Sequence, residues 1–208
     1  MALLFVDTTY DITLGILDEN LGWMKFDKFF GQKASAIIQS ETYNLLESVH
    51  LKISDITSLI SIAGPGFYTG LRLSEGFADV LTFAGIKHYS FLSYSIPFLS
   101  GATNGVWMTK AYRGEYFFHF WDSTSSRNEL VAAKDLEEFI KSVDMSNFYI
   151  HSESSIDDYS RKFLTSYLTT NELLEKYSPK ILSSVILSDS KKESFYFRAP
   201  EDEFKVSI

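Results

Sequence analysis

The chain has 208 residues, and 45% of them are apolar, including 18 Phe and 12 Tyr, which is enough to build a globular core. Its formal net charge is −8 and it has no cluster of Lys and Arg, so it lacks the composition of a protein that binds nucleic acid by itself. The absence of Cys excludes disulfides, thiolate metal sites and Cys nucleophiles. Because the amino-terminal apolar run is too short for a signal peptide or a membrane span, we expect a cytoplasmic protein without membrane association.

The first hundred residues predict strands and helices in a specific order. Short apolar or alternating runs predict strands, and apolar residues spaced three and four apart predict helices. The predicted elements are strands at 2–6, 12–17 and 21–30, a helix at 33–50, a strand at 59–63, a helix at 69–84 and a strand at 87–92. The order of three antiparallel strands followed by two helix-to-strand crossovers is typical of a ribonuclease-H-like lobe with a mixed sheet.

The second half has weaker patterns of the same two kinds. They predict strands at 105–112 and 115–122 with a turn at Arg113-Gly114, a helix at 134–143, a strand at 148–151, and a helix at 156–177 with an interruption at 169–171. Small and polar residues gather at 95–104, which indicates a boundary. We therefore expect an α/β protein with a division of the chain near residue 100.

The most distinctive stretch is residues 62–75, Ile-Ala-Gly-Pro-Gly-Phe-Tyr-Thr-Gly-Leu-Arg-Leu-Ser-Glu, where a buried strand leads through a turn into a helix. Gly64, Gly66 and Gly70 permit backbone angles and close approaches that a β-carbon forbids. We expect Thr69 to cap the helix by accepting a hydrogen bond from an N–H group of its first turn. The turn has neither the Gly-Lys-Ser/Thr of a P-loop nor the glycine spacing of a dinucleotide site.

Few residues are arranged for chemistry. Asp7-Thr8-Thr9, after the first strand, could hold a metal-bound phosphate or could form an Asx turn between strands, and the sequence leaves both open. The four His residues lie far apart in the sequence without metal-binding spacing, and no Ser is fixed beside a His and an acid. We therefore predict no catalytic residue, no metal site and no cofactor.

The stretch Ala63-Gly64-Pro65-Gly66-Phe67-Tyr68-Thr69-Gly70-Leu71-Arg72 resembles the Gly-Pro-Gly-Ser-Phe-Thr-Gly-Val/Leu-Arg signature of the bacterial TsaB (YeaZ) family. Three further motifs occur in the family's order. They are Asp7-Thr8-Thr9 for its Asp-Thr-Ser, Ala111-Tyr112-Arg113-Gly114-Glu115-Tyr116 for its Asp-Ala-Arg-x-Gly-Glu-Tyr hairpin, and Tyr196-Phe197-Arg198-Ala199-Pro200 for its closing Tyr-Leu-Arg-x-Pro. The chain departs from the family where it has Ala63 for Arg, Phe67 for Ser and Lys110 for Asp.

The resemblance implies a two-lobed fold of the actin and sugar-kinase (ASKHA) type, with a ribonuclease-H-like lobe at residues 1–100 and a smaller, reduced lobe at 101–208. It also implies a subunit without a catalytic site. In this family the subunit pairs with a larger homologous TsaD subunit, which threonylcarbamoylates the adenosine beside the tRNA anticodon, and a TsaE ATPase joins the assembly. By this resemblance tRNA would be bound only through the complex, Asp7, Thr8 and Thr9 would be a vestigial cofactor site, and the helices at 34–49 and 69–84 would contact the partner. The candidate partner-binding residues are Ile37, Glu41, Leu45, Thr69, Gly70, Arg72, Leu73, Gly76, Phe77 and Val80.

Three alternatives stay open from the sequence. The chain could be an independent enzyme, either a nucleotide-dependent phosphotransferase that uses Asp7 or a peptidase-like protein. It could be a module that self-associates through the same two helices. The apolar face of the helix at 69–84 could also pack only on its own sheet.

Overall fold

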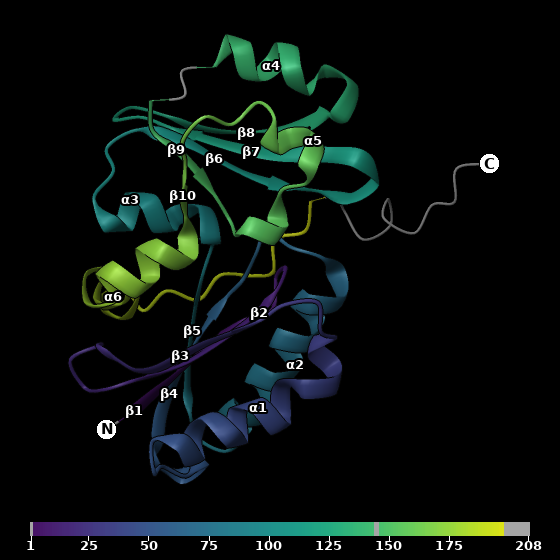
Figure 1. Cartoon of the computed structure of the whole chain (residues 1–208). Helices are drawn as coiled ribbons and strands as arrows, with labels where there is room; N and C mark the ends of the chain where they lie inside the picture. The colour runs from purple at the N-terminus through teal and green to yellow at the C-terminus, as the bar shows by residue number, and fades with distance from the viewer. Residues whose placement is uncertain (1, 144–145, 198–208) are drawn as a thin grey trace.

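The computed structural model describes residues 2–143 and 146–197, and these fold into two lobes, each built on a five-stranded mixed sheet (Figure 1). The two lobes and their mixed sheets confirm the predicted fold class. The second sheet is reduced in the length of its strands, because two of them contain only three and two residues.

The sheet of the first lobe has the order β3-β2-β1-β4-β5, with strands Ala2–Asp7 (β1), Ile12–Leu17 (β2), Trp23–Phe29 (β3), Ile56–Ile62 (β4) and Lys87–Phe91 (β5). The first three strands are antiparallel, whereas β4 and β5 run parallel to β1. Helices α1 (Ala34–Ser48) and α2 (Tyr68–Phe83) cover the outer face of this sheet (Figure 1). Parallel strands require such crossovers, so the predicted order of elements is confirmed.

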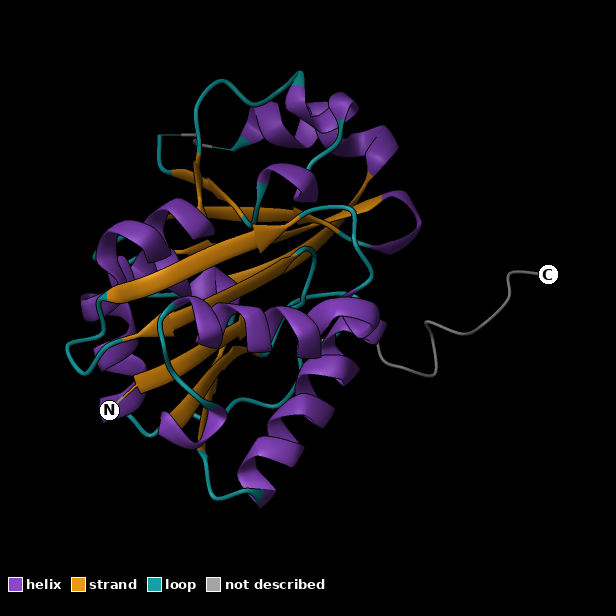
Figure 2. Cartoon of the chain, turned by 60° about the horizontal axis from the view of Figure 1, so that its bottom comes forward, coloured by secondary structure: helices purple, strands orange, loops and turns teal. Residues whose placement is uncertain are grey.

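The sheet of the second lobe has the order β10-β9-β6-β7-β8, with strands Gly105–Lys110 (β6), Glu115–Trp121 (β7), Ser126–Ala132 (β8), Phe148–Ile150 (β9) and Leu168–Thr169 (β10). The short helices α4 (Leu136–Ser142) and α5 (Asp158–Arg161) lie over its outer face. Helices α3 (Ile96–Ser100) and α6 (Thr170–Leu187) lie between the lobes (Figure 1). Figure 2 shows from below that helices border the strands on more than one side.

The largest core lies between the two sheets. It joins Phe5 and Ile60 of the first sheet to Trp107 and Phe117 of the second. Ile181 of α6 belongs to the same buried cluster. The alternating residues of β1 and β4 point instead toward α1 and α2, where they form a separate cluster. Each inner strand is therefore apolar on both faces, which is why β1 appears in the sequence as a continuous apolar run.

One prediction for the second half was wrong, and one strand was missed. Residues 156–177 do not form one helix, because the chain passes through α5 and β10 before α6 begins at Thr170. The predicted interruption is the start of α6: Thr169 Oγ1 accepts a hydrogen bond from the backbone N–H of Glu172, whose carboxylate accepts one from the N–H of Thr169. This capping box, Thr-x-x-Glu, was a signal available in the sequence.

Strand β8 was not predicted, because its sequence Ser-Arg-Asn-Glu-Leu-Val-Ala begins with four polar residues and has only three apolar ones at its end. The strand lies at the edge of the second sheet, and within the described part of the chain it pairs only with β7. Charged residues are common on edge strands, where they prevent pairing with another chain. Beyond α6 the chain returns to the first lobe, where the backbone N–H of Phe195 donates to the carbonyl of Ala63 at 2.7 Å.

Candidate protein-interaction surface

The glycine turn between β4 and α2 is pressed against the loop that follows β1. A β-carbon on Gly66 would lie 2.7 Å from the Cβ of Thr9, and one on Gly70 would overlap the carbonyl oxygen of Thr8. The hydroxyl of Thr8 in turn donates to the carbonyl of Gly70 at 2.7 Å. The predicted need for glycine is therefore confirmed. For Gly70 the need arises from a contact within this chain, with the carbonyl oxygen of Thr8.

The predicted cap at Thr69 is wrong. Helix α2 begins one residue earlier, at Tyr68, so that Phe67 occupies the capping position, and no side chain of the described residues caps the helix. Thr69 lies exposed within the first turn. The hydrogen bond from Thr8 to Gly70, together with the close packing of the glycines, fixes this end of α2 instead.

The Asp7-Thr8-Thr9 motif makes contacts within the chain. Oδ1 of Asp7 accepts hydrogen bonds from the backbone N–H and the hydroxyl of Thr9, at 2.8 and 2.6 Å, as an Asx turn does. Nε2 of His151, at the end of β9, lies 3.0 Å from the Thr9 hydroxyl and 3.4 Å from Oδ2 of Asp7. With the carboxylate and both hydroxyls engaged, these residues do not fit a metal-bound phosphate in this arrangement.

The contact of His151 with Thr9 was not predicted from the sequence, because the two residues are 142 positions apart and only the packing of the lobes brings them together. Nearby, Asp11 accepts hydrogen bonds from the hydroxyls of Ser152 and Ser154, and burial raises the pKa of its carboxyl group. The same corner of the fold thus carries two polar connections between the lobes.

Lys110, which stands where the family has Asp, has a partner within the second lobe. Its ammonium group lies 2.9 Å from Oδ2 of Asp157, and the hydroxyl of Tyr116 donates to Oδ1 at 2.8 Å. Burial acts to raise the pKa of Asp157, but the hydrogen bonds from Lys110, the backbone N–H of Ser160 and Tyr116 outweigh it and lower the pKa.

A groove of about 880 Å³ runs between α1 and α2 on the outer side of the first lobe. Most of its lining is apolar, and several of these side chains are exposed, including Tyr43 at 64% and Val80 at 68%. We call this the α1–α2 groove. Its lining residues are Ile38, Gln39, Thr42, Tyr43, Leu46, Glu47, His50, Leu51, Lys52, Ile53, Arg72, Leu73, Gly76, Phe77, Val80 and Leu81.

The groove brings together five of the ten predicted contact residues, namely Arg72, Leu73, Gly76, Phe77 and Val80. The α1 side of the prediction differs from the structure, because Leu45 is only 2% exposed and belongs to the core beneath the helix. Ile37 and Glu41 are half-buried and, with Thr69 and Gly70, lie outside the residues that line the groove. Tyr43 and Ile53 line the groove and were not predicted, although the helical spacing of Tyr43 from Gln39 and Glu47 was a signal for a shared face.

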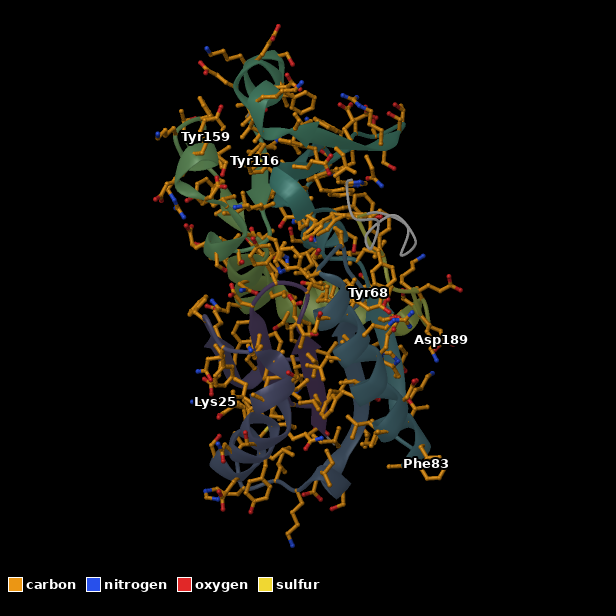
Figure 3. The ribbon with its side chains drawn as sticks, turned by 90° about the vertical axis from the view of Figure 1, so that its right-hand side faces the viewer. Lys25, Tyr68, Phe83, Tyr116, Tyr159 and Asp189 are labelled. Carbon is orange, nitrogen blue, oxygen red and sulfur yellow. The ribbon has the colours of Figure 1, made fainter. Side chains whose placement is uncertain are left out.

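Arg72 stands at one end of the groove with its guanidinium held by neighbours. Its carbon Cζ lies 5.4 Å from the ring centre of Tyr68 and 5.9 Å from that of Tyr196, and Nη1 donates to Glu75 at 2.9 Å. Figure 3 shows Tyr68 near the junction of the lobes and Phe83 at the opposite end of α2, pointing outward.

A second cavity, of about 530 Å³, lies on the other side of α2 and is lined by polar residues. In it the hydroxyl of Ser61 lies 2.8 Å from Nε2 of His88, a pair from adjacent strands that the sequence did not predict. Burial lowers the pKa of His88, which favours the neutral form of its ring. Asp79 lines the same cavity, but among the described residues no hydrogen bond joins it to this ring, so the geometry of a Ser-His-acid relay is incomplete.

Residues 2–143 and 146–197 contain no group of three His, Asp or Glu side chains placed to hold a metal ion. The same residues include no helix with the length and apolar character needed to cross a membrane.

The two mixed sheets, their helix-covered outer faces and the shared interior define a two-lobed protein of the actin and sugar-kinase (ASKHA) fold class. No model of a known protein family matches the chain, and no curated protein matches its sequence. Solved structures do match it over most of their length.

One similar structure is YeaZ from Pseudomonas aeruginosa, with a TM-score of 0.60 and 15% identity over 90% of this chain and 92% of that one. Another is a protein with similarity to peptidase YeaZ from Pseudomonas aeruginosa, with a TM-score of 0.65 and 14% identity over 95% of this chain and 99% of that one. The ethanolamine utilization protein EutJ from Carboxydothermus hydrogenoformans has a TM-score of 0.51 and 14% identity, over 89% of this chain and 90% of that one. At these identities the likeness shows a shared fold.

Proposed function

We propose that this chain is a member of the TsaB (YeaZ) family and a non-catalytic partner subunit. Its role is to bind and activate a larger TsaD-type subunit that threonylcarbamoylates the adenosine beside the tRNA anticodon. The fold shared with YeaZ structures supports this proposal, as do the four motifs in the family's order along the chain. Of these motifs, Arg198-Ala199-Pro200 lies outside the described residues.

The observation that carries the proposal is the α1–α2 groove. Soluble monomers rarely expose a large contiguous apolar surface, and a groove between two adjacent helices accepts the apolar face of a partner helix. Val80 and Tyr43 are exposed on opposite walls of the groove, while Leu73 and Phe77 are half-buried at its base. A partner helix in the groove would bury all four side chains and form a helical bundle with α1 and α2.

The charge of the chain supports the remaining parts of the proposal. A net charge of −8 opposes contact with the phosphates of tRNA, so tRNA would be held by the larger subunit within the complex. A TsaE-type ATPase would join that complex. The buried and engaged state of Asp7 favours a subunit without a nucleotide site of its own.

The test is a comparison of two charged substitutions at exposed apolar positions. Val80→Asp places a carboxylate on the wall of the groove, whereas Leu187→Asp places one on α6 at a side chain that is 85% exposed and outside the groove. We expect Val80→Asp to weaken binding of the TsaD-type subunit at least about tenfold, because a buried unpaired charge is unfavourable at an interface, and Leu187→Asp to leave it unchanged.

Binding is measured by isothermal titration calorimetry with the purified TsaD-type subunit of the same organism. Equal affinity of both variants and the wild type would contradict docking in this groove, and failure of the wild type to bind would contradict the whole proposal. Light scattering of the chain alone distinguishes a self-associating module, which would form a dimer sensitive to Val80→Asp.

A further inference from the structure

The segment after α6, residues 188–197, is attached to the first lobe at several points. The backbone N–H of Ser90 donates to the carbonyl of Ser190, and the hydroxyl of Ser90 accepts from the N–H of Lys192 at 2.7 Å. Farther along, Phe195 bonds to Ala63, and Tyr196 pairs with Gly66 in an isolated β-bridge. The segment therefore runs past the edge of β5 and ends against the glycine turn that begins α2.

The close fit of this segment depends on the turn. Gly64 has a φ of +117°, and a β-carbon there would lie 2.5 Å from the carbonyl oxygen of Phe195. The two backbones can approach this closely only because Gly64 has no side chain. As a result, Tyr196 is brought to the first turn of α2, where its ring centre lies 5.5 Å from that of Tyr68 with an interplanar angle of 35°.

Arg72 is held between these two rings and Glu75. Its side chain is 55% exposed, and an exposed arginine loses several rotamers when it is fixed in one place. The hydrogen bond with Tyr68 and the nearby Tyr196 and Glu75 raise the pKa of the guanidinium. Arg72 lines the α1–α2 groove, whereas Tyr196 is not among the lining residues.

We propose that Tyr196 is a positioning residue for the docking surface, holding Arg72 at the end of the α1–α2 groove so that it presents a cation to the incoming helix. The inference rests on the proposed function for the identity of the partner. A guanidinium has five N–H donors, and Glu75 accepts from Nη1, so Arg72 can also bind a carboxylate at the end of the partner helix. The partner that fits has an apolar helix face with an acidic residue at the end that meets Arg72.

The position of Arg72 is tested first without any partner. The chemical shift of the Nε–Hε group of Arg72 in ¹⁵N NMR spectra is sensitive to the ring currents of Tyr68 and Tyr196. Tyr196→Phe keeps the ring, so we expect the Arg72 signal to remain at its wild-type shift, whereas Tyr196→Leu should move it toward the value of a free arginine. An unchanged signal in Tyr196→Leu would overturn the positioning role, whether or not a partner binds.

Binding of the TsaD-type subunit is then measured for the same variants. We expect Tyr196→Leu to weaken affinity about three- to fivefold, as for loss of one cation–π contact, and Tyr196→Phe to change it less than about twofold. In an Arg72→Gln background, Tyr196→Leu should have no further effect. If each Tyr196 substitution weakens binding in the Arg72→Gln background as much as it does in the wild-type background, Tyr196 acts only on stability and the inference is wrong.

These outcomes separate the two proposals. If the wild type does not bind the subunit, the proposed function fails while the NMR result still decides the position of Arg72. Circular dichroism and urea unfolding of each variant show whether the first lobe remains folded, and Tyr196→Phe serves as the conservative control if Tyr196→Leu is destabilised.

Discussion

Oδ2 of Asp7 lies 3.4 Å from Nε2 of His151, and each side chain is about 5% exposed or less, so a buried polar pair joins the end of β1 to the end of β9. The hydroxyl of Thr9 lies between them. Since its single hydrogen is donated to Asp7, the contact with Nε2 requires His151 to carry a proton on that nitrogen. The pair therefore connects the two lobes and fixes which nitrogen of the ring is protonated.

Replacing His151 with Ala should destabilise the fold. The substitution removes the hydrogen bond between Nε2 and the Thr9 hydroxyl, and with it the contact of the ring with the buried carboxyl group of Asp7. A buried polar group left without its partner costs about 1–3 kcal/mol. The free energy of unfolding in urea measures this effect. His151→Gln retains an N–H donor and should recover part of the loss.

The matched control for His151 is His50, which is exposed and has a φ of 58°. His50→Asn keeps a residue that tolerates this backbone conformation, so stability should change by less than about 0.5 kcal/mol. Equal stability of the wild type and His151→Ala would show that the pair does not hold the lobes together.

Two glycines of α2 should respond to alanine in opposite directions. At Gly70 a β-carbon overlaps the carbonyl of Thr8, so Gly70→Ala forces the backbone apart and should destabilise the protein by about 1–3 kcal/mol. At Gly76 a β-carbon meets no atom within 4 Å, so Gly76→Ala should stabilise the helix by about 0.5–1 kcal/mol. Thermal unfolding of both variants is the measurement.

Gly76→Ala also tests how closely a partner approaches the groove. Because the variant is expected to fold at least as well as the wild type, any loss of affinity for the TsaD-type subunit reports a steric contact at this position. We expect a loss of affinity, since Gly76 lines the groove and a facing helix would lie against it. Unchanged affinity would place the partner backbone away from Gly76.

Asp157 should make stability depend on pH in the acidic range. Its pKa is lowered in the folded protein, so its contribution is complete above the unfolded value of about 4 and is lost as the pH falls toward the folded value. Asp157→Asn preserves a residue suited to capping α5 but removes the charge beside Lys110. Because the site is partly exposed, we expect the variant to lose about 1 kcal/mol at pH 6.

Below about pH 4 the difference between Asp157→Asn and the wild type should shrink, because the carboxylate of Asp157 takes up a proton in the unfolded chain while it is still ionised in the folded protein. Urea unfolding at intervals of about one pH unit, from about pH 3 to about pH 7, measures this change. Asp158→Asn removes the same charge from the exposed neighbouring residue and serves as the matched control at each pH. A constant difference for Asp157→Asn would indicate that its ion pair with Lys110 does not form in solution.

The sequence by itself determined the order of strands and helices in the first lobe. It also determined the glycine positions in the turn between β4 and α2. Strong local patterns, such as the apolar run of β1 and the helical spacing of α2, arise from burial against one sheet and are therefore visible in a short window. The glycines of the turn were predicted for the same reason, because a missing side chain marks a close approach even before the neighbour is known. The polar edge strand β8 carried no such pattern.

The tertiary structure alone decided what each turn residue contacts. His151 meets Asp7, and Tyr196 meets Arg72, across separations of more than a hundred residues. The tertiary structure also showed that Leu45 belongs to the core while Tyr43 lines the α1–α2 groove, although both residues lie on α1. Such contacts depend on how whole lobes and helices pack, and the local order of residues does not encode that packing in any single stretch.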